Sequence, residues 1–443
     1  MSSRAGLICS LAALSWSCPT NCPEEEFDCR GVCVLEGSNG PQHCGFGELC
    51  HDCPEQPFPN TMGFCSDPSQ GHCDFMCRSG FADCNGRRDD GCETTLWDDP
   101  ANCGSCGNVC HGVCAGGACT TKVAEGESDP AGLAVSEAGI FWAARSGDSL
   151  QIRQGHTDGT APTVVASVDA PRGEPVALAI AGNNLFWTTG SYLQPDGGGG
   201  AIYRLQLSGG GSAAQLAAAQ DAPGALVALP DHVYWTNFGG GQVMRLVLDG
   251  GTAEEIASGQ LHPRTLIEDE GQLYWVNEGA DGGGGAVMSL HLDGRGAPVR
   301  ISDDGTLSDG GTVPTASAPT AVGVVRTLPD PLATGFTARV VCWTDRAQPV
   351  IWATTGGAPF ALTFPQAPWD PRQLIGGSET IYLLDTAAGA LERLDRLYIL
   401  GSPDYAPPFR LFSLWLPPMS SPVLAAMGGY GIGWIDGSNI WLR

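Results

Sequence analysis

From residue 121 onward the chain repeats one short pattern of apolar and polar positions. Each copy begins with an aliphatic residue and a second residue that is usually apolar. In most copies a Trp comes next, and small or polar residues follow it. The copies are IFWAA at 140–144, LFWTT at 185–189, VYWTN at 233–237, LYWVN at 273–277, VCWTD at 341–345, IYLLD at 381–385 and IGWID at 432–436. Their Trp positions recur at intervals of 40 to 68 residues, which is typical of one propeller blade per copy.

Each copy belongs to a longer unit of four predicted strands. A segment with Leu and Ala precedes the Trp segment, a third strand follows it and ends at a Gly turn, and a short outer strand closes the unit. The segments 202–211 and 243–251 end in Ser-Gly and Asp-Gly, which supply the positive φ that a tight hairpin needs. Outer strands are predicted at 163–167, 254–259 and 298–302. The pattern predicts an all-β fold, a seven-bladed β-propeller, with six blades as the fallback if the unit at 373–413 is irregular.

The two ends of the repeat region complement each other. The last unit stops after three strands, at 423–427, 432–436 and 439–443, while a single strand at 121–124 precedes the first unit. Pairing these ends would close the ring and remove two exposed sheet edges. We therefore expect residues 121–443 to form one propeller, closed by strand 121–124 in the C-terminal blade.

The large aromatic residues are expected to fill the space between neighbouring blades. They are Trp142, Trp187, Trp235, Trp275, Trp343 and Trp434. The YWTN, YWVN and CWTD segments resemble the YWTD propellers of lipoprotein-receptor ectodomains and the related TolB-like and lactonase-like bacterial propellers. In the YWTD family the acidic residue of the motif ties neighbouring blades together by hydrogen bonds. The resemblance gives that role to Asn237, Asn277, Asp345, Asp385 and Asp436, and it implies an incomplete network because Ala144 and Thr189 stand at the other two positions.

Cysteine usage separates residues 18–120 from the repeats. Of the 19 cysteines, 18 lie at or before Cys119, which is typical of a disulfide scaffold in an oxidising compartment. The tight spacing predicts an irregular module without helices or strands of ordinary length. Zinc ligation with nearby histidines (His43, His51, His72, His111) is disfavoured, because thiols oxidise in an exported chain. The expected disulfide cysteines are Cys22, Cys29, Cys33, Cys44, Cys50, Cys53, Cys65, Cys73, Cys77, Cys84, Cys92, Cys103, Cys106, Cys110, Cys114 and Cys119.

Residues 1–17 have the features of an export signal. Arg4 precedes an apolar stretch at 5–16 of signal-peptide length, and Cys18 follows shortly after it. A Cys at this point is similar to the lipidated Cys of a bacterial lipoprotein signal, although Trp16 is unusual there. Plain secretion, with Cys18 unlipidated, is the alternative. The expected location is therefore outside the cell, or on the outer membrane or cell surface as a lipoprotein held only by its lipid.

The segment 83–119 carries a second resemblance. Its DCNG, GCET and DPANCGSCGNVC phrases are similar to a short cysteine motif of exported proteins from predatory and soil-dwelling Gram-negative bacteria. Asp83, Asn85 and Asp90 also place several oxygen ligands around a tight turn, as calcium loops do. The spacing departs from that of an EF-hand, so these three are either turn residues or a calcium site, and calcium is the only cofactor considered for the chain.

Charge and motifs restrict the function further. Asp and Glu number 48 against 22 Lys and Arg, for a net charge of −26, which excludes nucleic-acid binding. The sequence contains no GxSxG, HExxH, P-loop or dinucleotide fingerprint. Two Asp-Gly tracts, 196–200 and 281–285, would project from one face of the propeller, where we expect a protein or glycan partner. The apolar first strands favour a binding scaffold without catalytic residues over the alternative, a metal-assisted hydrolase or lyase with its site at the propeller axis.

Overall fold

The computed structural model divides into two compact units, residues 1–119 and 120–443. The structure describes residues 26–29, 32–35, 53–67, 72–169, 177–190, 199–208, 211–279, 284–292, 296–302, 319–326, 339–346, 348–354, 360–363, 371–376, 380–385, 390–395, 411–413, 422–428 and 431–443. The predicted signal at 1–17 and the lipidation candidate Cys18 lie outside these ranges. Within them, no helix combines the length and apolar character needed to cross a bilayer.

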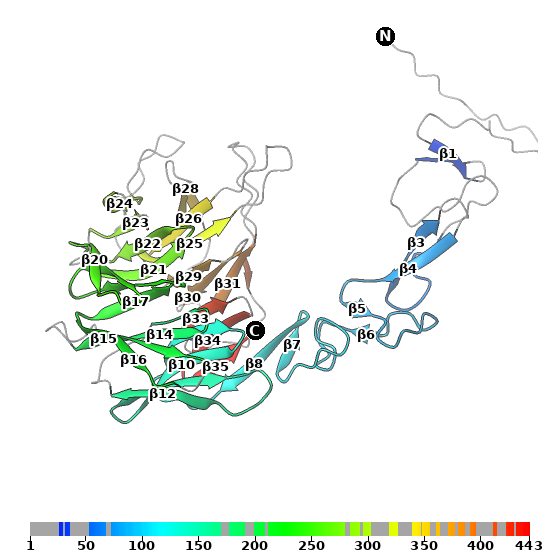
Figure 1. The fold of residues 1–443 in the computed structure, drawn as a ribbon. Coiled ribbons are helices and arrows are strands. Elements are labelled where there is room, and N and C mark those ends of the chain that lie inside the picture. The colour runs from blue at the N-terminus through cyan, green and yellow to red at the C-terminus, as the bar shows by residue number, and fades with distance from the viewer. Residues whose placement is uncertain are drawn as a thin grey trace, which may run out of the picture. The chain divides into compact units, whose positions relative to one another are not determined.

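The N-terminal unit contains short antiparallel hairpins (Figure 1), and disulfides cross-link it. Its strands are β1 (Glu26–Cys29) paired with β2 (Val32–Leu35), β3 (Thr61–Asp67) with β4 (His72–Cys77), β5 (Phe81–Ala82) with β6 (Thr94–Thr95), and β7 (Val113–Ala115). The disulfides in the described residues are Cys53–Cys73, Cys77–Cys92, Cys84–Cys106, Cys103–Cys114 and Cys110–Cys119. Cys65 is also disulfide-bonded. Of the other predicted disulfide residues, Cys22, Cys44 and Cys50 lie outside the described residues, and Cys29 and Cys33 are described only as parts of β1 and β2.

The expectation that strands of ordinary length do not fit into this unit is wrong. β3 has seven residues and β4 has six. The physical reason is that cysteines themselves occupy strand positions: Cys65 lies within β3 opposite Cys73 of β4, and Cys77 ends β4. A disulfide can therefore leave a strand sideways without interrupting it.

The second unit contains six antiparallel four-stranded sheets in a propeller arrangement (Figure 1). The first sheet has β9 (Ala131–Ser136), β10 (Gly139–Ser146), β11 (Ser149–Gly155) and β12 (Thr163–Asp169), and the second has β13 (Leu178–Ala181), β14 (Asn184–Thr189), β15 (Gly200–Gln206) and β16 (Ala214–Gln220). The third has β17 (Pro223–Ala228), β18 (His232–Asn237), β19 (Gln242–Val247) and β20 (Glu254–Ala257), and the fourth has β21 (Pro263–Asp269), β22 (Gln272–Asn277), β23 (Ala286–His291) and β24 (Val299–Arg300). The fifth has β25 (Pro319–Arg326), β26 (Arg339–Asp345), β27 (Gln348–Thr354) and β28 (Phe360–Thr363), and the sixth has β29 (Pro371–Gly376), β30 (Thr380–Asp385), β31 (Ala390–Asp395) and β32 (Leu411–Ser413). The first strand of each sheet lies next to the first strand of the following sheet.

A further sheet combines strands from both ends of this unit. β33 (Pro422–Gly428), β34 (Gly431–Asp436) and β35 (Asn439–Leu442) are followed in the sheet by β8 (Ala118–Ala124). β8 pairs antiparallel with β35, so that Lys122 lies opposite Trp441 and Thr121 opposite Leu442. β33 also lies next to both β29 and β9, the first strands of the sixth and first sheets.

Packing between sheets explains the repeated aromatic phrase. Successive side chains of a strand point to opposite faces of its sheet. On β14, Trp187 packs with Phe141 of the first sheet, while the preceding residue, Phe186, packs with Trp235 of the third sheet. Both faces of β14 are therefore covered, and its two consecutive aromatic residues are fully buried.

The same packing continues around the unit. Tyr234 packs with Trp275 of the fourth sheet, and Tyr274 packs with Trp343 of the fifth. Trp142 of the first sheet shares a cluster with Ile440 of β35, so the sheet that contains both ends packs against the first sheet as well. The predicted all-β propeller preceded by a disulfide-rich unit is confirmed at this level.

Candidate functional site

Two sets of connections meet at one end of every sheet. Because neighbouring strands are antiparallel, the segment that enters a first strand and the turn between the second and third strands lie at the same end. The backbone N–H of Phe238, in the β18–β19 turn, donates to the carbonyl of Ala222 just before β17 at 3.0 Å. The N–H of Glu278, just after β22, donates to the carbonyl of His262 just before β21 at 3.2 Å. We call this end of the propeller unit the loop face.

A proline begins five of the first strands, and each lies opposite the polar residue that ends the Trp motif. The pairs are Pro223 with Asn237, Pro263 with Asn277, Pro319 with Asp345, Pro371 with Asp385 and Pro422 with Asp436. In all five sheets the strand register shifts directly after the proline. Proline has no backbone N–H and cannot donate a ladder hydrogen bond, which accounts for the break in strand register at this position. All five motif residues are buried.

Two glutamines that the sequence analysis missed bind this motif. The Gln260 Oε1 accepts hydrogen bonds from Trp275 Nε1 at 3.0 Å and from Asn277 Nδ2 at 3.0 Å. The Gln220 Oε1 accepts from Trp235 Nε1 at 3.0 Å and from Asn237 Nδ2 at 3.1 Å.

Gln220 ends β16, the outer strand of the second sheet, while Trp235 and Asn237 lie on β18 of the third. Each glutamine thus links neighbouring sheets, which is the kind of link that the YWTD resemblance implies for Asn237 and Asn277. A repeated Gln-x-x-Pro, at 220–223 and 260–263, was the signal in the sequence that could have found them.

In the first sheet a carboxylate stands at the position of this glutamine. Glu127 stands three residues before Pro130, as Gln220 does before Pro223, but its Oε2 pairs with Arg153 Nη1 at 2.8 Å. The Glu127 side chain is only 4% exposed, so this is a nearly buried ion pair. The sequence places Ala144 at the motif position of the first unit, and the structure shows an ion pair in this part of the sheet instead.

A compact cluster of aromatic and charged side chains lies on the loop face between the third and fourth sheets. The rings of Phe238 and His262 stack with centroids 4.6 Å apart, and the Arg264 guanidinium lies 5.4 Å from the Phe238 centroid. Arg264 Nε forms an ion pair with Glu278 at 2.8 Å. Leu261 is 47% exposed beside them. We call these five residues, together with Asp221, the 221–278 cluster.

The backbone that carries the cluster is strained. Ala222 and His262 have φ values of 50° and 56°, and Asp129 has 45° at the equivalent position of the first sheet. Each of these residues precedes a proline, where a left-handed conformation of a residue with a Cβ is unfavourable. Such strain persists only where surrounding contacts impose it, and it is often found at functional sites.

The calcium candidates Asp83, Asn85 and Asp90 lie in the N-terminal unit. Oxygens of Asp83, Asp90 and Glu93 lie within 4.8 Å of one another. Most of these groups already have protein donors: Asp83 Oδ1 accepts the N–H of Gly86 at 2.7 Å, and Asn85 Nδ2 donates to Asp90 Oδ2 at 3.1 Å. Calcium binding stays a prediction from the sequence.

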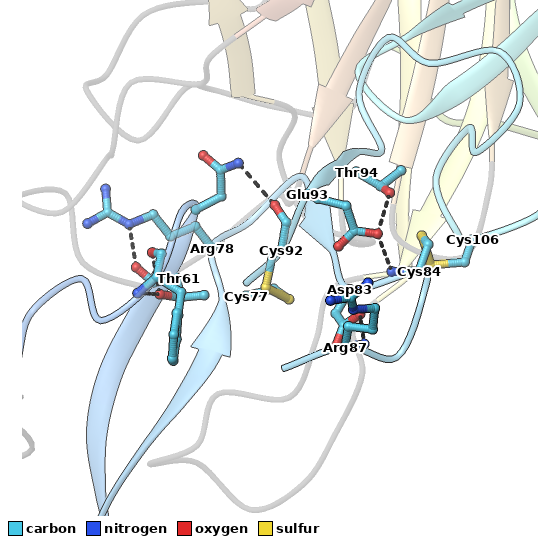
Figure 2. Close-up of a disulfide and its surroundings, with 12 residues drawn as sticks. Thr61, Cys77, Arg78, Asp83, Cys84, Arg87, Cys92, Glu93, Thr94 and Cys106 are labelled. Atoms are coloured by element: carbon cyan, nitrogen blue, oxygen red, sulfur yellow. Dashed lines mark hydrogen bonds between the residues drawn. A yellow bond between two sulfur atoms is a disulfide. The ribbon is translucent and has the colours of Figure 1, made fainter. Parts of the chain in front are cut away.

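Glu93 completes the oxygen cluster, although the sequence analysis did not include it. A hydrogen bond from its own backbone N–H, and then those from Thr94 and from the Cys84 N–H, lower the pKa of the Glu93 carboxyl. The disulfide Cys84–Cys106 lies beside it (Figure 2). Glu93 is therefore ionised at neutral pH and is held on the same turn as Asp83.

Other predicted features are only partly within the described residues. The Asp-Gly tracts at 196–200 and 281–285 are described only at 199–200 and 284–285. Asp345, Asp385 and Asp436 are buried at the ends of β26, β30 and β34. In the sixth sheet Leu383 takes the Trp position and is fully buried. The ten cysteines in the described disulfides carry no thiolate, so they do not offer zinc ligands.

No known protein family matches the chain, and no curated protein does either. Solved structures do match it. A catalytically inactive variant of virginiamycin B lyase from Staphylococcus aureus with quinupristin is 14% identical, with 73% of this chain and 97% of that chain covered and a TM-score of 0.51. The selenomethionine form of that lyase has the same identity and coverage and a TM-score of 0.50. A chain of a nidogen–laminin complex is 16% identical, with coverage of 59% and 88% and a TM-score of 0.38. At this identity the similarity to the lyase structures supports the β-propeller fold alone.

Proposed function

We propose that this protein is an exported, non-catalytic binding scaffold whose loop face holds a protein or a glycan. The observation that carries the proposal is the 221–278 cluster. It combines a half-buried aromatic ring, an Arg–carboxylate ion pair and an exposed Leu, held by a strained backbone. Aromatic residues and Arg, surrounded by polar groups, dominate the energetics of protein interfaces.

The alternative is a metal-assisted hydrolase or lyase with its site at the propeller axis. Such a site needs polar side chains on the first strands. In the first sheet β9 presents Leu133, Ala134 and Val135, all buried, and β13 presents Leu178, also buried. These residues support a structural role for β9 and β13 and favour the binding scaffold, whereas β21 carries Arg264, Glu268 and Asp269.

Glycan and peptide arrays probed with the full-length oxidised protein test the proposal. We expect at least one class of arrayed ligand to bind, and Phe238→Ala to reduce that signal at least tenfold. Val164→Ala is the matched control, since Val164 is 49% exposed on β12, far along the chain from the cluster. Absence of signal on both arrays, or an equal loss in both variants, contradicts the proposal.

We further infer that the sheet of β33, β34, β35 and β8 is a seventh blade. Its support is the contact of β33 with both β29 and β9, and the cluster that Ile440 shares with Trp142. An experimental structure in which β33 contacts β29 but not β9 would contradict a closed ring of seven.

The disulfides support an extracellular location, because disulfides persist in oxidising compartments. We propose secretion, or attachment to the outer membrane or cell surface through lipid on Cys18. Mass spectrometry of the exported protein distinguishes the two by the presence or absence of an acyl group on Cys18.

A further inference from the structure

The imidazole of His262 is fixed in one tautomer at the loop face. Its Nδ1 lies 2.8 Å from the carbonyl oxygen of Gly279. A carbonyl oxygen can only accept a hydrogen bond, so Nδ1 carries the hydrogen and the neutral ring keeps its lone pair on Nε2. The His262 residue is exposed, and its ring is stacked on Phe238. It therefore presents a hydrogen-bond acceptor in a fixed orientation.

The charged groups of the cluster also favour a donor as ligand. The positive charge of Arg264 is compensated by Glu278 at 2.8 Å. Asp221 supplies a further carboxylate, packed against the β18–β19 turn: a Cβ added at Gly239 would lie 2.3 Å from its Oδ1. That Oδ1 is buried without a hydrogen-bond partner in the described part of the chain. The cluster thus has a net negative charge, on a protein whose net charge is −26.

The apolar part of the cluster does not suit a sugar ring. Stacking on a sugar needs an exposed aromatic face, but the Phe238 ring already contacts the His262 ring and the Arg264 guanidinium. Leu261, with 47% of its surface exposed, offers aliphatic contact instead. An aliphatic side chain of a partner protein can pack there and remove apolar surface from water.

We propose that the 221–278 cluster binds a basic, amphipathic segment of a partner protein. An Arg or Lys of the partner donates to His262 Nε2, the negative charge of Asp221 attracts that cation, and a neighbouring aliphatic side chain packs on Leu261. This inference rests on the proposed binding function and gives the chemistry of its partner. Charge complementarity of this kind raises the association rate and excludes acidic partners.

Fluorescence anisotropy with three labelled peptides tests the inference on the full-length, disulfide-intact protein. The first peptide combines Arg and Leu, the second replaces Arg by Glu, and the third replaces Leu by Ser. We expect only the first to bind well at low salt. Asp221→Asn and Leu261→Ser should each weaken its binding about fivefold or more.

Two control variants match these changes. Asp249→Asn removes an exposed carboxylate from the β19–β20 turn, at the opposite end of the third sheet, and leaves the same net charge as Asp221→Asn. Val299→Ser removes a 58% exposed aliphatic side chain from β24. Both should change binding of the first peptide less than twofold.

Several results overturn the inference, and they separate it from the proposed function. If Asp249→Asn weakens binding as much as Asp221→Asn, the peptide senses only the overall charge. If the Glu peptide binds and Leu261→Ser abolishes that binding, the loop face is a binding surface but its partner is not basic. If no peptide binds while a glycan array gives a signal that depends on Phe238, the inference fails and the proposed function stands. If nothing binds, both fail.

Discussion

Replacement of Gln260 by Met tests whether the glutamine link holds neighbouring sheets together. Met has a similar length but offers no comparable acceptor, so the Trp275 Nε1 and the Asn277 Nδ2 lose the oxygen that they share. Both donors are buried, with Trp275 fully so. An unsatisfied buried donor costs about 1–3 kcal/mol. We therefore expect Gln260→Met to lower the free energy of unfolding by about 2–4 kcal/mol.

Guanidinium denaturation followed by tryptophan fluorescence, with disulfides kept oxidised, measures this change. Gln215→Met is the control, because Gln215 is exposed on β16. Gln220→Met should cost less than Gln260→Met, since Asn237 Nδ2 also has Gln242 Oε1 within 3.3 Å. The reasoning is refuted if Gln260→Met lies within about 0.5 kcal/mol of the control, the usual range of a surface substitution.

Four further predictions concern three other parts of the chain. Burial raises the pKa of the Cys342 thiol from 9.0 to about 12, so maleimide should not label it at pH 8 unless the protein is unfolded; labelling of the native protein would contradict this. Because the pKa of Cys342 is higher in the folded protein than in the unfolded chain, the stability that the thiol contributes should be lost as pH rises from about 9 toward 12 and the melting temperature should fall; a constant melting temperature over this range would contradict this. Replacing Cys110 and Cys119 together by Ser should lower the free energy of unfolding by about 3 kcal/mol, because this disulfide closes a loop of about ten residues. The double variant should also exchange amide hydrogens faster in β8, where Cys119 lies. Unchanged exchange would show that the disulfide does not support this strand. Arg339→Met removes ion pairs of 2.7 Å to Asp269 and 3.0 Å to Glu270. It should lower the free energy of unfolding by about 1–3 kcal/mol, and by less in high salt. A loss that does not depend on salt would point to packing instead.

The sequence predicted the propeller well because its packing is periodic. A sheet covered on both faces requires consecutive large apolar residues, and Phe186-Trp187 or Tyr234-Trp235 show this directly in the sequence. Asp-Gly at 249–250 likewise marked a turn, and Gly250 has a φ of 89°. Local signals of this kind need no knowledge of the tertiary structure.

The candidate site could not be predicted in the same way. Phe238, His262 and Arg264 lie in or next to connections between strands, and their contacts depend on how two sheets come together. Gln260 lies in the connection between β20 and β21, outside the repeated Trp phrase, and the pairing of β21 with β22 brings it beside Asn277. The 16 cysteines from Cys22 to Cys119 allow many pairings, and spacing alone does not select among them.

The antiparallel pairing of β8 with β35 has a consequence for the order of synthesis. β8 is made before the other strands of its unit and its partner after all of them, so a nascent or partly exported chain carries two open strand edges for most of that time. Contacts between such distant segments form slowly, because the intervening chain must first be ordered. A factor that delays aggregation until the last hairpin emerges would therefore raise the yield of this protein more than a factor that accelerates any single sheet.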